Sequence, residues 1–294
     1  MMRWLCVLVV TAVACRAPAR AGAGGRDGVR LVSLHDVTTE ALVRMGAVDR
    51  LVGVAELVSP AIEVQAAVAG LRRVASAESI LALAPTAVVG LAVVAEQDPD
   101  LVATLRARGI EVYLGRPRTL DQVYEVVREV GRRARASDGA ERAIAAVSGR
   151  GLAPPPARSG AGPVARVFVY DGGDPPFTAG GETVLSDLIA RAGAHNVFAD
   201  LAAGWTHVSW EEVIARAPTH LVVDDYATEG GGGAGAVEPA RAAAALAGKR
   251  ARLAAMPGLA GLPVLALPLG QVLGGLGSAD AIDRLRALVT GGAG

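Results

Sequence analysis

Two histidines occupy positions from which they could do metal chemistry. His35 directly follows a short apolar run, and His207 lies two residues after a tryptophan in the second half of the chain. Residues that follow the buried strands of an α/β fold face its ligand crevice. The two imidazoles, with Asp36 or Asp171 beside them, could therefore ligate iron directly or serve as axial ligands of haem. The alternative is that each imidazole only makes a local hydrogen bond, because the four histidines lack H-x-H and H-x₃-H spacing.

Two tyrosines and a glycine pair are the other candidate groups. Tyr170 and Tyr226 each end an apolar run in the second half of the chain and are alternative ligand contacts. Gly172 and Gly173 do not satisfy G-x-G-x-x-G and indicate a turn. The sequence also lacks G-x-S-x-G, a P-loop and H-E-x-x-H. These observations predict a protein that binds a ligand without catalysis and without a cofactor.

Charge and cysteine content exclude several further classes. The 29 basic and 29 acidic residues give a formal net charge of zero, which argues against a nucleic-acid or polybasic membrane-binding surface. The two cysteines, Cys6 and Cys15, both lie at the start of the chain. The body of the protein therefore has no internal disulfide and no thiolate metal site.

The start of the chain has the features of an export signal. Residues 1–3 form a short basic head, and residues 4–14 are apolar and uncharged. Eleven such residues are too few to cross a hydrocarbon core, which needs about 20, but they suit a signal peptide. We therefore expect a signal peptide at residues 1–15, and a mature protein in the periplasm or on the outer face of the cytoplasmic membrane.

The end of this signal is a candidate lipidation site. The sequence AVAC, which ends at Cys15, is similar to a loose lipobox, in which the cysteine becomes the lipidated N-terminus. Cleavage after Ala14 or near Ala21, without lipidation, is the alternative. Residues 16–29 are rich in alanine, glycine and arginine and are expected to form a tether.

The rest of the chain alternates between strand-like and helix-like segments. This alternation predicts parallel sheets covered by helices. It runs over residues 30–117, the expected N-terminal lobe, and again over residues 164–290, the expected C-terminal lobe. Between them lie residues 118–150, in which apolar residues recur at helical spacing from Leu120 to Val130. Ser137, Asp138 and Gly139 are a candidate interruption, but the length of the segment predicts one long linking helix.

Two stretches of the chain repeat one pattern. SAESILALAPTAVV begins at Ser76 and SWEEVIARAPTHLV begins at Ser209, a constant offset of 133 residues. Each predicts a capped helix, a proline stop and a buried strand. Any helix–proline–strand unit in an alanine-rich protein would look similar, but the shared serine and glutamate favour a duplication. The sequence therefore predicts an α/β fold with two Rossmann-like lobes, a central cleft and one long α-helix joining the lobes.

Several motifs resemble those of a known family. RLVSLHDVTTEALVRMGAVDRLVGV from Arg30, DPPFTAGGET from Asp174 and GWTHVSWEEV from Gly204 are the most informative stretches. They are similar to the helix-linked (class III) solute-binding proteins of ABC importers, which carry cobalamin, ferric siderophores or haem. The resemblance covers nearly everything from residue 30 to residue 289. It implies that an ABC permease in the inner membrane is the partner.

The resemblance also implies roles for individual residues. Phe177 and Thr178 would lie on a loop at the cleft, and Trp205 would face the ligand, where an aromatic face suits a macrocycle. Glu78 and Glu211 would be the paired surface glutamates, one on each lobe, that engage arginines of the permease. The alternatives are that the aromatics are core residues and that the glutamates only stabilise helix N-termini.

The chain departs from the cobalamin-binding pattern in its N-terminal lobe. That pattern has further aromatic residues there, whereas residues 56–60 and 72–76 of this chain have none. The predicted ligand is therefore a metal chelate, with ferric siderophore, cobalamin and haem all open. Direct binding of a metal or haem through His35 and His207 remains an alternative.

We therefore expect a monomeric substrate-binding component that delivers the chelate to its permease with a small closing motion. A sensor lipoprotein that binds its ligand without a transporter is another alternative. An enzyme on the same scaffold is disfavoured, because such enzymes usually need cysteine ligands.

Overall fold

The computed structural model describes residues 27–57, 61–149, 164–226 and 239–291. The expected signal peptide, Cys15 and most of the expected tether lie outside these residues. Asp27 and Val29 already belong to the N-terminal lobe, because Asp27 pairs with Arg50 at 3.0 Å and Val29 is buried. Among the described residues, no helix is long and apolar enough to span a bilayer.

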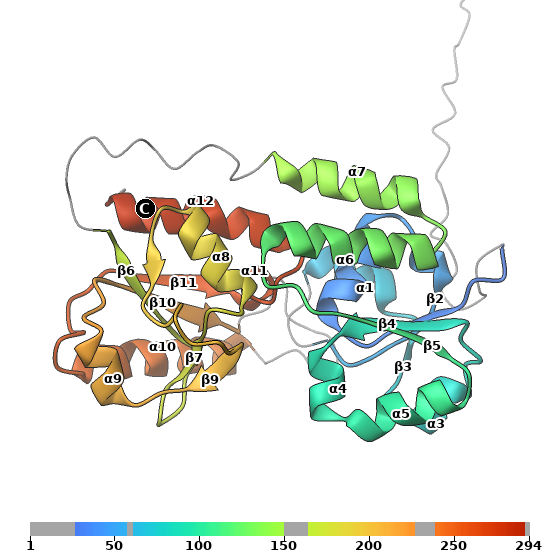
Figure 1. Ribbon diagram of the computed structural model, residues 1–294, viewed down its shortest axis with the longest axis horizontal. Helices are drawn as coiled ribbons and strands as arrows, with labels where there is room; N and C mark the ends of the chain where they lie inside the picture. The colour runs from blue at the N-terminus through green and yellow to red at the C-terminus, as the bar shows by residue number, and fades with distance from the viewer. Residues whose placement is uncertain (1–26, 58–60, 150–163, 227–238, 292–294) are drawn as a thin grey trace, which may run out of the picture.

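The N-terminal lobe is built on a five-stranded parallel sheet (Figure 1). Its strand order is β3-β2-β1-β4-β5, so the order reverses between β1 and β4 as in a doubly wound fold. Its central strands are buried on both faces, which helices on both sides require. The elements are β1 (Leu31–Ser33), α1 (Asp36–Arg44), η1 (Val48–Arg50), β2 (Leu51–Val54), α2 (Ile62–Val68), β3 (Arg72–Arg73), α3 (Ala77–Leu81), β4 (Ala87–Leu91), α4 (Val93–Gln97), α5 (Pro99–Ala107) and β5 (Glu111–Gly115).

The C-terminal lobe has a four-stranded parallel sheet in the order β11-β10-β6-β8, and a separate antiparallel pair, β7 and β9. The fold class expected from the sequence, two α/β lobes with parallel sheets, is confirmed. The elements are β6 (Arg166–Tyr170), β7 (Phe177–Ala179), α8 (Val184–Arg191), β8 (His195–Asn196), β9 (Trp205–His207), α9 (Trp210–Ala215), β10 (His220–Asp225), α10 (Pro239–Ala255), β11 (Val264–Pro268), α11 (Leu269–Val272), η2 (Leu276–Ser278) and α12 (Ala279–Thr290).

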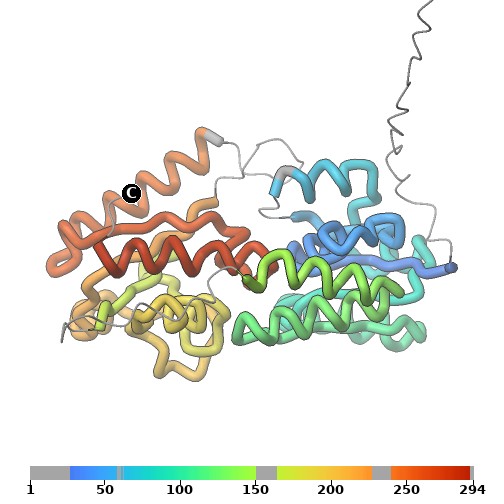
Figure 2. The backbone as a smooth tube through the Cα atoms, turned by 90° about the horizontal axis from the view of Figure 1, so that it is seen from above, coloured from blue at the N-terminus to red at the C-terminus, as the bar shows by residue number. Residues whose placement is uncertain are grey.

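The expected single linking helix is wrong. The segment forms two helices, α6 (Leu120–Arg133) and α7 (Ser137–Ser148), which lie side by side over the N-terminal lobe (Figures 1 and 2). The break is a left-handed residue, Arg135, with φ of 50°. The N–H of Ala136 donates to the carbonyl of Gly131, and that of Arg135 to the carbonyl of Arg132, which is the Schellman pattern of a helix end. Glycine is the usual residue at this position. Because Arg135 takes its place here, the sequence shows no sign at this position that the helix ends.

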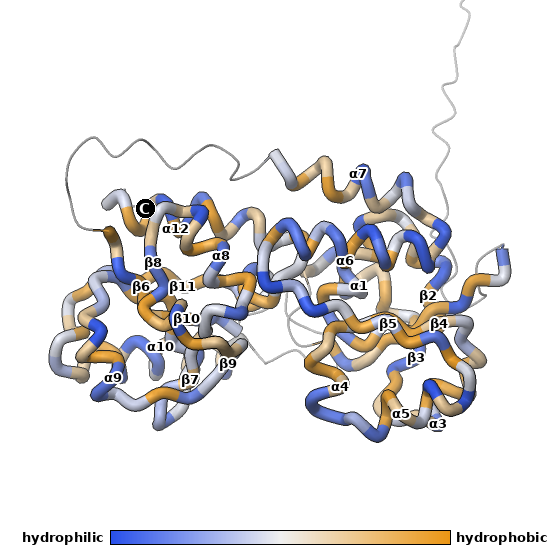
Figure 3. Tube along the Cα trace, viewed as in Figure 1, coloured by the Kyte–Doolittle hydropathy of each residue, from blue (hydrophilic) through white to orange (hydrophobic). Residues whose placement is uncertain are grey.

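Close packing holds the two linking helices in place. A Cβ on Gly131 would lie 2.6 Å from Cβ of Ala140, and a Cβ on Gly139 would collide with the carbonyl oxygen of Met45. Both glycines are buried where helices cross closely. Hydrophilic and hydrophobic residues alternate along α6 in Figure 3, and its buried stripe faces the N-terminal lobe.

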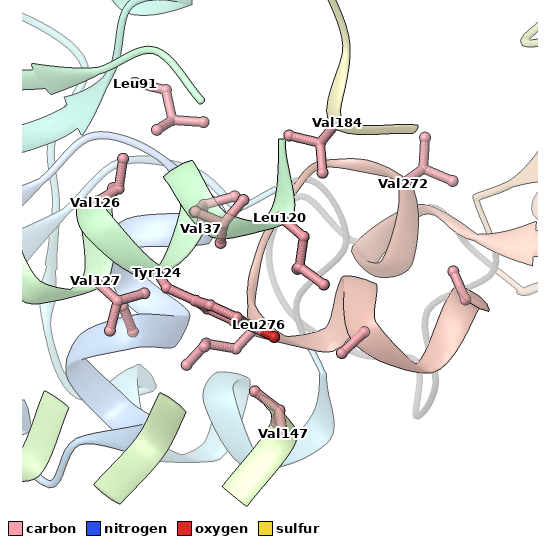
Figure 4. Packing of buried hydrophobic residues seen from close by; sticks show 14 of the residues in the cluster. Val37, Leu91, Leu120, Tyr124, Val126, Val127, Val147, Val184, Val272 and Leu276 are labelled. Atoms are coloured by element: carbon pink, nitrogen blue, oxygen red, sulfur yellow. The ribbon is translucent and has the colours of Figure 1, made fainter. Parts of the chain in front are cut away.

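One hydrophobic core continues across the junction between the lobes. Leu120 and Tyr124 of α6 and Val147 of α7 belong to the same buried cluster as Val272 and Leu276 of the C-terminal lobe. Figure 4 shows Tyr124 reaching from α6 toward Leu276. Because apolar burial stabilises by about 25 cal/mol per Å², separating the lobes here would expose core surface. The junction therefore resists large lobe movements.

Candidate ligand-binding site

A cleft between the lobes lies at the carboxyl ends of the N-terminal lobe strands. It encloses about 750 Å³ of space, part of it open solvent. The segments that follow β1, β4 and β5 form its N-terminal wall, so it contains the point where the strand order reverses, the usual ligand position in such sheets. β9 and the start of α8 form the facing wall, and α11 contributes Val272 at the lobe junction.

His35 lines the N-terminal wall of this cleft. It is the N-cap of α1, and its Nδ1 accepts a hydrogen bond from the N–H of Val37 at 3.2 Å. Burial lowers the pKa of His35, against an opposing effect of Asp36, so the imidazole is neutral at pH 7. Because Nδ1 accepts, the proton of the neutral ring is on Nε2. In this arrangement His35 is a hydrogen-bond donor at Nε2.

The paired strands β7 and β9 carry three neighbouring rings. β7 and β9 pair so that Phe177 lies opposite His207 and Ala179 lies opposite Trp205. The rings of Phe177 and Trp205 are stacked, with centroids 5.9 Å apart and planes at 28°. The ring of His207 lies 4.8 Å from that of Phe177. Of these three residues, Trp205 lines the cleft. The sequence placed Phe177 and Trp205 on loops, because three-residue strands are too short to show an alternating pattern.

The structure does not bring His35 and His207, the two candidate metal-binding histidines, together in the lining of this cleft. Nδ1 of His207 lies 3.1 Å from the carbonyl oxygen of Pro175, and His207 is not among the described residues that line the cleft with His35. Within the described ranges, no group of three or more His, Cys, Asp or Glu side chains is placed to hold a metal ion.

Two of the expected ligand contacts are structural in this fold. Thr178 is fully buried, and its hydroxyl donates to the carbonyl of Val169 at 2.7 Å, so it fastens β7 to β6. Tyr170 is also buried, and its hydroxyl donates to the carbonyl of Gly173 at 3.0 Å. Its ring packs 5.4 Å from that of Trp210 in the core of the C-terminal lobe. Neither side chain reaches the cleft.

Tyr226 belongs to a charged cluster at the ends of β6 and β10. Its hydroxyl donates to Asp171 at 2.8 Å, and Nζ of Lys249 lies 3.2 Å from the same carboxylate. Burial, followed by the charge of Asp171, raises the pKa of Tyr226. Burial and the same charge also raise the pKa of the neighbouring Asp224 well above its ordinary value, although Lys249 opposes this. Asp171 is thus occupied by protein partners, and none of these four residues lines the cleft.

Charged residues at the cleft were missed by the sequence interpretation. Arg116 pairs with Glu96 at 2.6 Å within the N-terminal lobe. Arg118 pairs across the lobes with Glu182 at 3.0 Å. Glu96, Arg116 and Glu182 line the cleft. Arg116, Arg118 and Glu182 lie in segments that connect a strand to a helix, and Glu96 lies in the five-residue helix α4. None of these segments is long enough to show a periodicity that would have identified them.

The repeated units form equivalent helices on the two lobes. Glu78 lies in the first turn of α3 and Glu211 in the first turn of α9, and both are exposed. In Figure 1, α3 and α9 lie along the lower edges of the two lobes. A hydrogen bond from its own backbone, and a further one from Ser76, lower the pKa of Glu78, so this carboxylate is ionised at neutral pH.

Comparisons with known proteins agree with this architecture. A model of the periplasmic binding protein family matches residues 31–257. The chain belongs to that family. It is 31% identical over 204 residues to the vitamin B12-binding protein of Yersinia pestis (strain Pestoides F), covering 66% of this chain and 69% of the relative.

Solved structures share the fold over nearly the whole chain. A periplasmic binding protein from Veillonella parvula has a TM-score of 0.73 at 22% identity, covering 90% of this chain and 91% of the other. The apo form of a periplasmic heme-binding protein from Roseiflexus sp. RS-1 has a TM-score of 0.67 at 26% identity, covering 90% and 99%. Members of this family are transport components, so this periplasmic binding protein is the substrate-binding component of an ABC transporter and not an enzyme.

Proposed function

We propose that this periplasmic binding protein captures a preformed metal chelate in the cleft between its lobes. The observation that carries the proposal is Trp205, which is stacked on Phe177 and lines the cleft. A rigid aromatic face binds a flat or macrocyclic ligand with little loss of side-chain entropy. The relatives named for vitamin B12 and heme support ligands of this kind.

The metal of this chelate is held by the chelator, not by the protein. His35 caps α1 through Nδ1, which leaves Nε2 as a donor to an oxygen or nitrogen at the edge of the ligand. His207 contacts Phe177 and Pro175 instead of facing His35 across the cleft. This favours cobalamin or a ferric siderophore, whose metal ligands belong largely to the molecule itself, over direct ligation by the two histidines.

The ligand proposal is tested by fluorescence titration with cyanocobalamin, haemin and ferrichrome. Trp205 lines the cleft, whereas Trp210 packs on Tyr170 and donates to Asp174. Quenching should therefore persist in Trp210→Phe and largely disappear in Trp205→Phe. Trp205→Ala should raise the Kd by roughly 5- to 150-fold, because losing a stacking face costs about 1–3 kcal/mol. Saturable quenching by none of the three compounds would refute the proposal.

We further propose that Glu78 and Glu211 dock the protein onto its permease. Two exposed carboxylates on equivalent helices of the two lobes can each meet an arginine fork of a partner with two similar halves. Glu78→Ala with Glu211→Ala should abolish uptake and leave ligand affinity unchanged. Glu63 is a matched control, because it is an exposed helix carboxylate of the N-terminal lobe, and Glu63→Ala should preserve uptake. Unchanged uptake in the double variant would refute the docking role of the two glutamates.

We also propose that the chain is exported and anchored through a lipid on Cys15, which lies outside the described residues. The apolar segment and the AVAC sequence support this. The mass of the mature N-terminus, measured on protein from its own host, tests the proposal. A diacylglyceryl cysteine is the expected result, and cleavage after Ala14 or near Ala21 without a lipid would contradict it.

A further inference from the structure

An arginine fastens the glutamate-bearing helix of the N-terminal lobe. The guanidinium of Arg30, just before β1, donates to the carbonyl of Leu83 at 2.7 Å and to that of Ala84 at 3.1 Å. These carbonyls follow the end of α3. The backbone of Arg30 is fixed as well, since its N–H donates to the hydroxyl of Thr86 at 3.0 Å and its carbonyl accepts from the N–H of Thr86. Arg30 thus ties the end of α3 to the sheet.

The C-terminal lobe contains the same arrangement. Nε of Arg166, at the start of β6, donates to the carbonyls of Arg216 and Ala217 at 3.1 and 3.2 Å. The N–H of Arg166 donates to the hydroxyl of Thr219 at 2.9 Å. Arg30 and Arg166 therefore hold the two repeated helices by the same contacts, and each arginine lies at or directly before the start of the first strand of its lobe. The sequence repeat had identified the helices but not these arginines.

Both helices need such support. α3 has five residues and α9 has six, and helices this short do not form without tertiary contacts. Capping boxes at Ser76 and Ser209 satisfy their N-termini. Their C-terminal ends turn through left-handed alanines, Ala84 with φ of 43° and Ala217 with φ of 41°, a conformation that surrounding contacts must enforce. The guanidinium groups bind the carbonyls at those turns.

We propose that Arg30 and Arg166 are positioning residues for permease docking, which fix the orientation of Glu78 and Glu211. This inference rests on the proposed docking role of the two glutamates. The arginines do not touch the permease themselves. They hold each short helix at its C-terminal end, and the glutamate in its first turn is thereby presented at a fixed angle.

The two lobes should differ in how much they depend on this arginine. α9 has a second anchor, because Arg216 pairs with Asp200 at 2.5 Å and lies 4.5 Å from the ring of Phe198. The equivalent position in the N-terminal lobe is Leu83, which is apolar. Loss of Arg30 should therefore loosen α3 more than loss of Arg166 loosens α9.

The test measures the affinity of the protein for the permease of its own import system, reconstituted in nanodiscs. Arg30→Gln should weaken binding by about tenfold and Arg166→Gln by about threefold. Arg142→Gln is the control, because Arg142 is an exposed arginine of α7, and it should have no effect. Arg30→Lys keeps a donor but not the planar fork, so its effect should be intermediate. Hydrogen exchange at amides 82–84 should accelerate in Arg30→Gln.

A double-mutant cycle separates positioning from general destabilisation. If Arg30 acts through Glu78, Arg30→Gln should add nothing to the loss of permease affinity in a Glu78→Ala background. Unchanged affinity in Arg30→Gln, with a loss in Glu78→Ala, would overturn the inference and leave the docking role intact. If neither glutamate variant lowers affinity, the docking proposal fails and the positioning role fails with it. Should Arg30→Gln not fold, Arg30→Lys in the same cycle decides the question.

Discussion

Truncation of Leu276 should weaken the junction between the lobes. Leu276 is 1% exposed and belongs to η2, which contacts α1, α6 and α7 of the other lobe. Leu276→Ala removes three carbon atoms, which costs about 2.4 kcal/mol in transfer free energy at about 0.8 kcal/mol per carbon. The remaining cavity raises the loss to about 3–4 kcal/mol. At about 2–4 °C per kcal/mol, the Tm should fall by about 6–16 °C.

The position of the damage distinguishes this prediction from a general loss of stability. The N–H of Leu120 donates to Asp187 across the junction at 2.8 Å, so its hydrogen exchange reports on opening between the lobes. Leu276→Ala should accelerate this exchange more than exchange in β4. Leu105→Ala is the matched control, because Leu105 is fully buried in a separate cluster of the N-terminal lobe, which also contains Val88 of β4. It should accelerate exchange in β4 instead. Equal protection of Leu120 in Leu276→Ala and wild type would refute a packed lobe junction.

Three further substitutions test individual contacts. Tyr124→Phe should raise the Tm by a few degrees, because the buried hydroxyl has no hydrogen-bond partner among the described residues; a lower Tm would indicate a hidden partner. Thr178→Val should cost about 1–3 kcal/mol in unfolding free energy, since it leaves the Val169 carbonyl without its donor, and titration should show unchanged ligand affinity. The fold raises the pKa of Asp224 above that of aspartate in the unfolded chain. The folded wild type therefore loses stability as the pH rises through this interval, because the unfolded chain ionises its aspartate first. Asp224→Asn should therefore gain in Tm over wild type as pH increases from about 4 to about 8, and a constant difference would contradict the raised pKa.

The sequence by itself determined the two lobes and their family. The 133-residue offset between the repeated units was visible because each unit is local, with cap, helix, proline and strand following one another within fourteen residues. Local signals of this kind survive in a sequence, since neighbouring residues carry all of the pattern. These local signals predicted the parallel sheets and the helices α3 and α9. They also predicted the exposed positions of Glu78 and Glu211.

Only the tertiary structure decided which side chains face the cleft. Thr178 and Trp205 lie on paired three-residue strands, and one side chain turns into the core while the other lines the cleft. Their directions depend on pairing between segments about thirty residues apart, which the sequence does not specify. The role of His35 likewise depends on a backbone N–H two residues away. The hairpin of α6 and α7 depends on a left-handed Arg135, where the usual glycine is missing. In each case a contact or a backbone angle, and not a residue type, made the difference.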